Sequence, residues 1–332
     1  MVKMLPHFEE GRAEVVLFGG GEELAPLRLA HLAPGEALPF HIFTAADGVP
    51  GEFVLTWRRG QALPPQAQEM VWGYFAVVEA GEVLSYLTAR AEETGRETPD
   101  YLRLLADTLL VWTQHFFCHE VARTPASLAG ARSLINSLAG RLGRGRSTLE
   151  TAGALRRHDS GLFCHCLNVC LLTLALAPSL GWEGQVGETL ALGALLHDLG
   201  MMPWASETIH QTAPLTDQEW DKIKTHPDRG ADLLEPFAEL SRDIVLMVRQ
   251  HHESANGSGY PQGLQGEEIH PWARLLRILD SYEAMTSLRP WRPPLSPKQT
   301  LRIMSSAWRT QGCYDQYFLK HFLAFCQGEE AY

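Results

Sequence analysis

The sequence predicts a mainly α-helical protein with a small mixed α/β domain at its N-terminus. Three observations support this prediction. Short β-rich runs occur before residue 90, the apolar pattern after about residue 160 is almost wholly helical, and paired histidines and aspartates end several of the expected helices. At 332 residues the chain is long enough for two domains. We predict a regulatory domain over residues 1–90, connecting helices over 91–149 and an all-helical domain over 150–328.

The N-terminal domain is expected to contain three short strands, over residues 15–18, 53–57 and 74–78. These runs are rich in β-branched and aromatic residues, and glycine and proline separate them. Residues 89–98 are charged and polar, which indicates a boundary. No polar residues converge in this part of the sequence, so we assign it no ligand.

Two helices are expected to connect the domains. The first begins at Thr98-Pro99-Asp100, which supplies an N-cap, a first-turn proline and an early acid, and it runs to about residue 121. The second begins at Thr124-Pro125, and its apolar residues follow at heptad-like spacing: Leu128, Ala131, Ile135, Leu138 and Leu142. This stripe favours burial against the helix's own domain over the alternative, a homodimer contact.

Five expected helices of the C-terminal domain carry histidine or aspartate side chains within them or at their ends. These helices cover residues 163–176, 187–196, 216–226, 243–250 and 272–285. A capping box formed by Thr216 and Glu219 starts the third of them. The side chains they deliver are His165, His197, Asp198, His226, His251, His252 and Asp280.

This set of side chains favours a metal site. Imidazole and carboxylate together suit first-row divalent ions such as iron, manganese, nickel and zinc. A single histidine is more often an ordinary core or surface residue, but the adjacent pairs His197-Asp198 and His251-His252 argue against that interpretation. Asp280 lies in an apolar run, where a lone buried charge is expensive, so it should be paired or metal-bound.

Composition excludes several classes of protein. The net charge of −11 argues against DNA binding, which needs a basic surface. Three of the six cysteines fall in one expected helix, so we interpret them as reduced core residues rather than disulfides or zinc ligands. The N-terminus lacks the apolar stretch of a signal peptide, and no apolar run approaches the ~18 residues of a membrane span. We expect a cytoplasmic protein that contacts no membrane.

Four ordered motifs in the C-terminal region resemble those of the HD-GYP family, a group within the HD phosphohydrolase superfamily. The first contains His197-Asp198 and is followed by a block that ends at His226-Pro227. The third runs from His251 to an intact Gly259-Tyr260-Pro261, and the fourth surrounds Asp280. The resemblance covers roughly residues 150–328.

The resemblance implies a fold of packed helices and hydrolysis of cyclic di-GMP, a bacterial second messenger, to linear pGpG, with a second cut to GMP left open. It also implies two divalent metal ions, for which iron or manganese is favoured and zinc, nickel or magnesium is acceptable. A hydroxide that bridges the two ions would attack phosphorus. The seven side chains named above would be the ligands, Asp198 would bridge the ions, and Asp198 and His197 would be the catalytic residues.

The same resemblance suggests substrate contacts beside the metals. Tyr260 and Gly259 belong to a glycine-rich loop that would contact a guanine base or a signalling partner of the GGDEF type. The alternative is a tight turn with a packed aromatic ring. Arg289 would bind phosphate through two hydrogen bonds, with a surface role as the alternative.

Two positions depart from the family pattern. Met201 stands where members usually carry a lysine, and Gly161 stands where some members carry a glutamate that assists a third metal. We therefore expect two metals and a reduced rate of hydrolysis. Two alternatives follow: a receptor that binds cyclic di-GMP with little turnover, and an HD hydrolase that acts on another cyclic dinucleotide.

Overall fold

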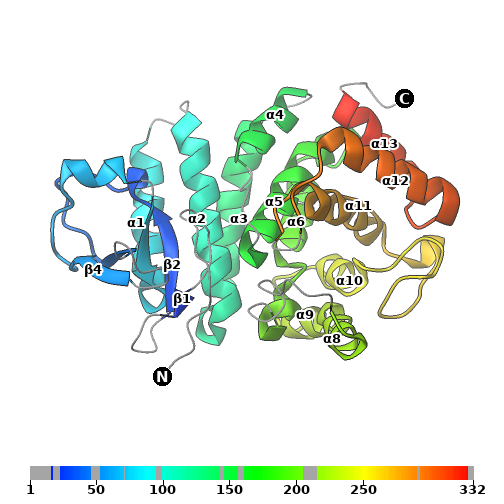
Figure 1. Ribbon diagram of the computed structural model, residues 1–332, viewed down its shortest axis with the longest axis horizontal. Helices are drawn as coiled ribbons and strands as arrows, with labels where there is room; N and C mark the ends of the chain where they lie inside the picture. The colour runs from blue at the N-terminus through cyan, green and yellow to red at the C-terminus, as the bar shows by residue number, and fades with distance from the viewer. Residues whose placement is uncertain are drawn as a thin grey trace. The chain divides into compact units, whose positions relative to one another are not determined.

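The computed structural model describes residues 16–17, 23–45, 53–70, 72–94, 99–142, 146–155, 161–204, 215–289 and 292–327. The chain divides into two compact units, Met1–Arg123 and Thr124–Tyr332 (Figure 1). The expected fold class is confirmed, because the first unit contains a small sheet and the described part of the second is helical. The predicted domain limits at residues 90 and 149 stay predictions, and the two connecting helices belong to different units.

The first unit contains a five-stranded antiparallel sheet with the strand order β1-β2-β5-β3-β4. The strands are β1 (Val16–Leu17), β2 (Glu23–Arg28), β3 (Ile42–Ala45), β4 (Phe53–Trp57) and β5 (Trp72–Ala76). Strand β4 lies where it was predicted, and β5 begins two residues earlier. Strands β2 and β3 were not predicted, because β2 contains a proline and β3 has only four residues.

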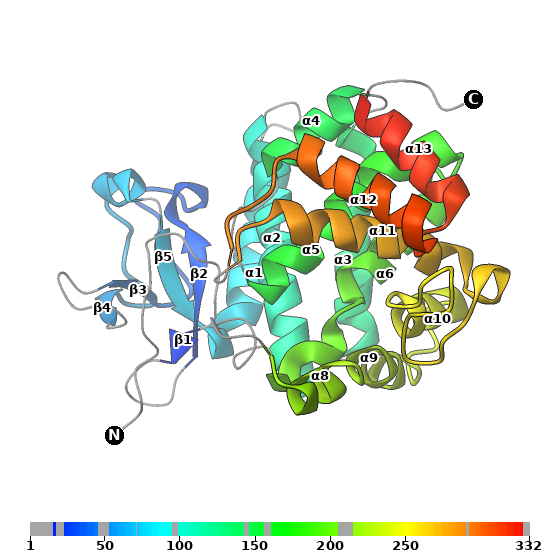
Figure 2. The ribbon, with the colours of Figure 1, turned by 45° about the vertical axis from the view of Figure 1, so that its right-hand side comes forward.

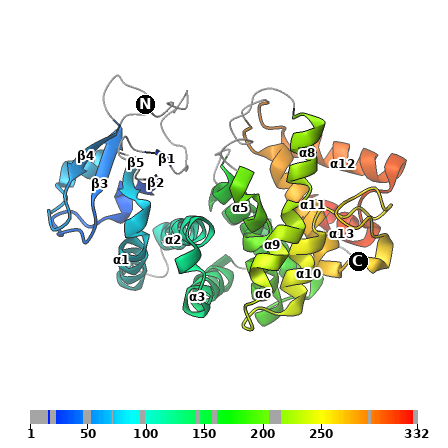
Figure 3. The same cartoon turned by 90° about the horizontal axis from the view of Figure 1, so that it is seen from below.

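Helices α1 (Ala80–Glu93) and α2 (Pro99–Cys118) complete the first unit and lie side by side (Figure 3). Short 3-10 turns join these elements: η1 (Leu29–His31), η2 (Pro65–Glu69), η3 (Val77–Glu79) and η4 (Glu120–Ala122). The expected boundary over 89–98 is wrong in its first part, because α1 continues to Glu93. Val83, Leu87 and Ala91 form the buried face of α1, so its charged residues occupy the exposed face.

The second unit is built around two central helices, α5 (Leu162–Leu176) and α6 (Gln185–Leu196), which pack against each other. Helices α3, α4, α10 and α11 surround this pair, and α12 and α13 pack against α11 (Figure 2). The bounds of the other described helices in this unit are α3 (Pro125–Leu142), α4 (Arg146–Leu155), α8 (Asp217–Ile223), α9 (His226–Leu234), α10 (Arg242–Gln250), α11 (Pro271–Thr286), α12 (Pro297–Gln311) and α13 (Gln316–Gln327). The 3-10 turns are η5 (Ala177–Leu180), η6 (Leu199–Trp204) and η7 (Gly266–Glu268).

The heptad-like stripe of α3 is a core-facing surface. Its five apolar residues, from Leu128 to Leu142, are all buried, and α3 packs against α5 and α6. This confirms the interpretation that the helix is buried against its own domain. The homodimer stays a prediction.

The segment Leu162–Leu180, which joins α5 and η5, has the length and hydropathy of a membrane-spanning helix. This corrects the expectation that no apolar run approaches that length. Within the protein 89% of its most apolar window is buried, and every side chain of α5 is buried. Helix α5 is therefore apolar on all sides because other helices surround it, as in the core of a helical domain.

Candidate metal centre

The structure brings all seven predicted side chains together, but the helix predicted over 216–226 ends at Ile223, and His226 begins a separate helix, α9. Helix α5 carries His165, and His197 directly follows the last residue of α6. The seven side chains form two clusters, and within each cluster the ligand atoms lie within 4.8 Å of one another. They are Asp198, His226, His251 and His252 in one, and His165, His197 and Asp280 in the other.

Asp198 lies between these two clusters. Its Oδ1 atom is 3.1 Å from Nε2 of His226 and 3.5 Å from Nε2 of His251. Its Oδ2 atom is 3.4 Å from Nε2 of His197 and 3.7 Å from Nε2 of His165. Each carboxylate oxygen therefore faces a different group of histidines, which is the arrangement that a bridging carboxylate requires. The assignment of a bridge stays a prediction.

Backbone carbonyls orient three of the imidazoles. The Nδ1 atoms of His197, His226 and His251 each lie 2.7 Å from the carbonyl oxygen of the residue three positions earlier. Since a carbonyl only accepts, these Nδ1 atoms must carry protons, so each ring in its neutral form directs the lone pair of Nε2 inward. The Nε2 atom of His197 is buried and has no hydrogen-bond partner. A buried acceptor nitrogen of this kind fits a cation better than it fits an empty space.

Glu283 holds the imidazole of His165 and was not assigned a role from the sequence. Its Oε2 atom accepts a 2.5 Å hydrogen bond from Nδ1 of His165, and its Oε1 atom accepts bonds from Asn168 and Ser287. The residue is fully buried. The contact directs Nε2 of His165 toward Asp280, whose Oδ1 atom is 3.1 Å away. A carboxylate behind a histidine ligand is a common way to orient that ligand.

The pKa shifts of four residues in the cluster favour the binding of a cation. Burial raises the pKa of Asp198 and Asp280, but the surrounding histidines outweigh burial and hold both values well below the ordinary range. Burial lowers the pKa of His251 to about 4 and that of His252 well below its ordinary value. At neutral pH the two carboxylates are therefore charged and these two imidazoles are neutral, which is the ionisation state that metal binding needs.

His165 is protonated in the absence of a metal. Burial lowers its pKa, but the carboxylates of Glu283 and Asp280 outweigh burial and raise it to about 10. The proton on Nε2 therefore neutralises part of the negative charge of the cluster. A metal ion at this position would take the place of that proton.

Close packing of two glycines sets the geometry around Asp198. A Cβ atom on Gly200 would lie 2.1 Å from the carbonyl oxygen of His226 and 2.7 Å from the backbone nitrogen of Gly230. Only a glycine allows η6 to approach α9 this closely, so Gly200, two residues after Asp198, helps to bring His226 to the cluster. The capping box of Thr216 and Glu219, predicted for the start of α8, is confirmed.

The loop that contains Gly259 and Tyr260 borders the cluster. The ring of Tyr260 stacks on His252, with 4.8 Å between ring centroids and 25° between planes. A Cβ atom on Gly259 would lie 2.3 Å from the backbone nitrogen of Ser254 and 2.5 Å from Cα of Glu253, so packing within the chain explains this glycine. A substrate contact by either residue stays a prediction.

Two arginines after α11 turn back toward that helix. Arg289 lies 3.6 Å from Glu283, and its side chain is only 16% exposed. Arg292 donates hydrogen bonds to the carbonyl oxygens of Ala284 and Met285 at the end of α11. Both arginines therefore have partners in this structure, and phosphate binding by Arg289 stays a prediction.

The three cysteines of α5 are buried free thiols, which confirms their interpretation as reduced core residues. Cys166 is nevertheless close to the cluster, because its Sγ atom lies within 4.8 Å of ligand atoms of His197 and Asp198. Burial, followed by the charge of Asp198, raises the pKa of this thiol well above its ordinary value. We assign the neutral thiol no ligand role.

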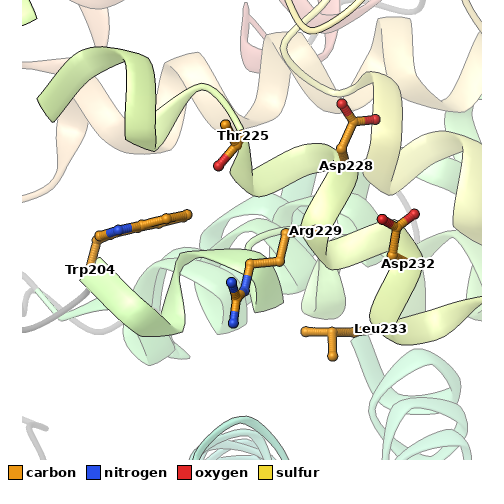
Figure 4. A pocket seen from close by; sticks show the side chains of 6 residues that line it. All are labelled: Trp204, Thr225, Asp228, Arg229, Asp232 and Leu233. Carbon is orange, nitrogen blue, oxygen red and sulfur yellow. The ribbon is translucent and has the colours of Figure 1, made fainter. Parts of the chain in front are cut away.

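A surface cavity of about 440 Å³ lies beside α9 (Figure 4). Trp204, Thr225, Arg229, Leu233 and two aspartates line it. The guanidinium of Arg229 lies 5.8 Å from the centroid of the Trp204 ring, and both aspartates pair with Arg249. Because these groups interact with neighbours, the cavity presents no polar group that requires a ligand.

Comparisons with known proteins identify the family of this chain. A family model described as an HD domain matches residues 146–316, just over half of the chain. The cyclic di-GMP phosphodiesterase PA4108 of Pseudomonas aeruginosa is 30% identical over 195 residues, which is 59% of this chain and 46% of that protein. The 3'3'-cGAMP-specific phosphodiesterase 1 of Vibrio cholerae is 32% identical over 143 residues, 43% of this chain and 33% of that protein. The chain thus spans less than half the length of either relative.

A solved structure shares the fold. Bd1817, an HDG"Y"P protein from Bdellovibrio bacteriovorus, superposes with a TM-score of 0.68 at 18% sequence identity. The similarity covers 92% of this chain and 100% of that chain. The chain therefore belongs to the HD domain family, and the ordered motifs around its histidine and aspartate cluster are those of the HD-GYP group.

Proposed function

We propose that this chain is a metal-dependent phosphodiesterase that hydrolyses cyclic di-GMP to linear pGpG. The observation that carries the proposal is the buried convergence of five imidazoles and two carboxylates, with Asp198 between the two clusters. The activities for which the two relatives are named support a cyclic dinucleotide as the substrate class. A second cut, from pGpG to GMP, is part of the same proposal.

The donor set fits two divalent ions, with iron or manganese favoured and zinc, nickel or magnesium acceptable. When bound, such ions supply Lewis acidity and lower the pKa of the water that attacks phosphorus. Asp198 and Asp280 would compensate two of the four positive charges. The remaining charge suits a cyclic dinucleotide, because its two phosphodiesters are both anionic.

The chain's own residues hold the reacting groups in place. Asp198 and His197, the proposed catalytic residues, are adjacent on a rigid helix end and are almost completely shielded from water. The backbone bond to Nδ1 of His197 prevents its ring from turning. The low dielectric around the cluster would strengthen each contact with the charge that develops during phosphoryl transfer.

The test combines metal content with turnover in one sample. Protein purified without oxygen should contain two metal ions per chain and should hydrolyse cyclic di-GMP to pGpG. Two ions with tight binding of cyclic di-GMP but no turnover would show a receptor instead. Absence of metal after reconstitution with iron or manganese would contradict the ligand assignment itself.

A second substrate is favoured by one comparison. One relative is named as specific for 3'3'-cGAMP, at an identity similar to that of the cyclic di-GMP enzyme. Turnover should therefore be measured with both cyclic dinucleotides at equal concentration. A larger kcat/KM for 3'3'-cGAMP would reassign the substrate and leave the metal centre in place.

The GGDEF-type partner, the homodimer and the cytoplasmic location stay predictions.

A further inference from the structure

We propose that Arg277 binds a phosphate of the substrate and supplies the positive charge that Met201 does not. The inference rests on the proposed function and adds a residue to its substrate site. Arg277 lies on α11, three residues before Asp280, so both side chains occupy the same face of the helix. Its Nη1 atom is 3.4 Å from Nδ1 of His252 and 4.0 Å from Oδ2 of Asp280.

Arg277 has donors that the protein leaves unused. Its Nε atom is buried without a hydrogen-bond partner, while the side chain as a whole is 27% exposed. The other arginine of α11, Arg274, has a close partner, since its Nη1 atom is 2.7 Å from Asp315. The guanidinium of Arg277 therefore combines access to solvent with hydrogen-bonding capacity at the edge of the metal centre.

Metal binding would release Arg277 further. In this structure Arg277 faces the carboxylate of Asp280, which is also contacted by His165 and His252. A carboxylate that binds a metal ion has less charge available to compensate an arginine. An anion that approaches the metals would then replace the Asp280 carboxylate as the partner of Arg277. A phosphate matches the planar guanidinium because it can accept two hydrogen bonds at once.

A stacked aromatic pair lies next to this arginine. The imidazole of His252, which Nη1 of Arg277 approaches, stacks on the ring of Tyr260 with 4.8 Å between the ring centroids. A cation beside aromatic rings matches a nucleotide, in which an anionic phosphate is joined to a flat base.

Met201 supplies no positive charge on η6. It follows Asp198 by three residues in η6, and its backbone nitrogen bonds to the carbonyl oxygen of Asp198. Its uncharged side chain cannot pair with phosphate. Arg277 approaches the cluster from a different helix, α11, so it would hold the substrate without filling the space of the missing lysine.

The experiment compares Arg277→Ala and Arg277→Lys with Arg302→Ala, which removes an exposed arginine from α12. Metal content, kcat and KM for cyclic di-GMP are measured for each metal-loaded protein, together with inhibition by inorganic phosphate. We expect Arg277→Ala to raise KM by about 10- to 100-fold, the usual effect of losing a charged hydrogen bond. It should weaken phosphate inhibition and keep the metal content. Arg277→Lys should recover part of the loss, and Arg302→Ala should match the parent.

An unchanged KM in Arg277→Ala, in a parent that turns over, would overturn the inference. So would a loss of metal, because Arg277 would then act on the metal centre rather than on the substrate. If the metal-loaded parent has no turnover, the proposed function fails separately. Calorimetric titration with cyclic di-GMP then decides the role of Arg277: at least tenfold weaker binding by Arg277→Ala supports it, and equal binding overturns it.

Discussion

Each of the two units buries a histidine next to a carboxylate, and the two arrangements differ in what completes them. In the first unit, Asp107 of α2 lies 2.7 Å from Nε2 of His31 and 3.3 Å from Nε of Arg28. One carboxylate there faces two groups that can donate protons. In the second unit, two carboxylates face five imidazoles, and three of those rings present acceptor nitrogens to the interior.

The difference separates a structural contact from a binding site. In the first unit the carboxylate faces two groups that can donate to it, so the contact is an ion pair that ties the end of β2 and η1 to α2. Acceptors outnumber donors in the metal centre, and the buried Nε2 of His197 has no partner. A buried His–Asp pair is therefore weak support for a metal site, whereas converging lone pairs without donors are strong support.

The largest expected effect comes from Asp198→Ala. Loss of the carboxylate that faces both clusters should remove at least one metal ion and lower kcat by about a thousandfold or more, since metal-ion catalysis is worth several kcal/mol. Metal analysis and turnover of cyclic di-GMP measure both results. Asp232→Ala, at an exposed position on α9, is the control. Unchanged metal content in Asp198→Ala would exclude the bridging role.

The matching change in the first unit is Asp107→Asn. Breaking a buried ion pair by neutralising one partner should reduce the free energy of unfolding by about 3–5 kcal/mol. Urea unfolding measures this loss, and Asp100→Asn at the exposed start of α2 is the control. Metal content should equal that of the parent. A loss of metal from Asp107→Asn would show that Asp107 also supports the metal centre, which would contradict its interpretation as a structural contact.

Glu283→Gln tests the support behind one ligand. The amide keeps the size of the side chain but removes the charge that orients His165 and raises its pKa. Competition with a chelator should show metal affinity weakened by about 10- to 100-fold, the usual effect of losing such a supporting carboxylate. Glu267→Gln, exposed in η7, should bind metal like the parent. Equal affinities for Glu283→Gln and the parent would mean that packing alone orients His165.

The sequence predicted the elements that carry their own local signals. Helices α5, α6 and α10 have strong apolar patterns, so their predicted ranges agree closely with the structure. The capping box placed the start of α8 correctly, but the predicted end at residue 226 was wrong because α8 ends at Ile223. Strand β2 contains a proline and depends on pairing with β1 and β5, which no local pattern reveals. The stripe of α3 showed that the helix is buried, but the apolar residues alone cannot show which unit covers them.

The candidate ligands were also easier to predict than the residues around them. Adjacent histidines and aspartates are unusual in sequence, and the structure brings all seven together. Glu283 and Arg277 are ordinary charged residues whose importance comes from lying three residues after and before Asp280 on one face of α11. That spacing was available in the sequence. What it could not show is that Glu283 turns toward His165 while Arg277 remains partly exposed.

The smallest expected effect concerns Met201→Lys, which adds a positive charge beside the cluster. If phosphate binding limits the rate, kcat/KM for cyclic di-GMP should rise by about two- to tenfold, as expected for one new charged hydrogen bond at a partly exposed position. Met202→Lys adds the same charge one residue later in η6 and is the matched control. The gain should be larger in an Arg277→Ala background, because the new lysine would then be the main cation for the phosphate. A Met201→Lys protein that is no faster than the parent in either background would show that this methionine does not limit hydrolysis.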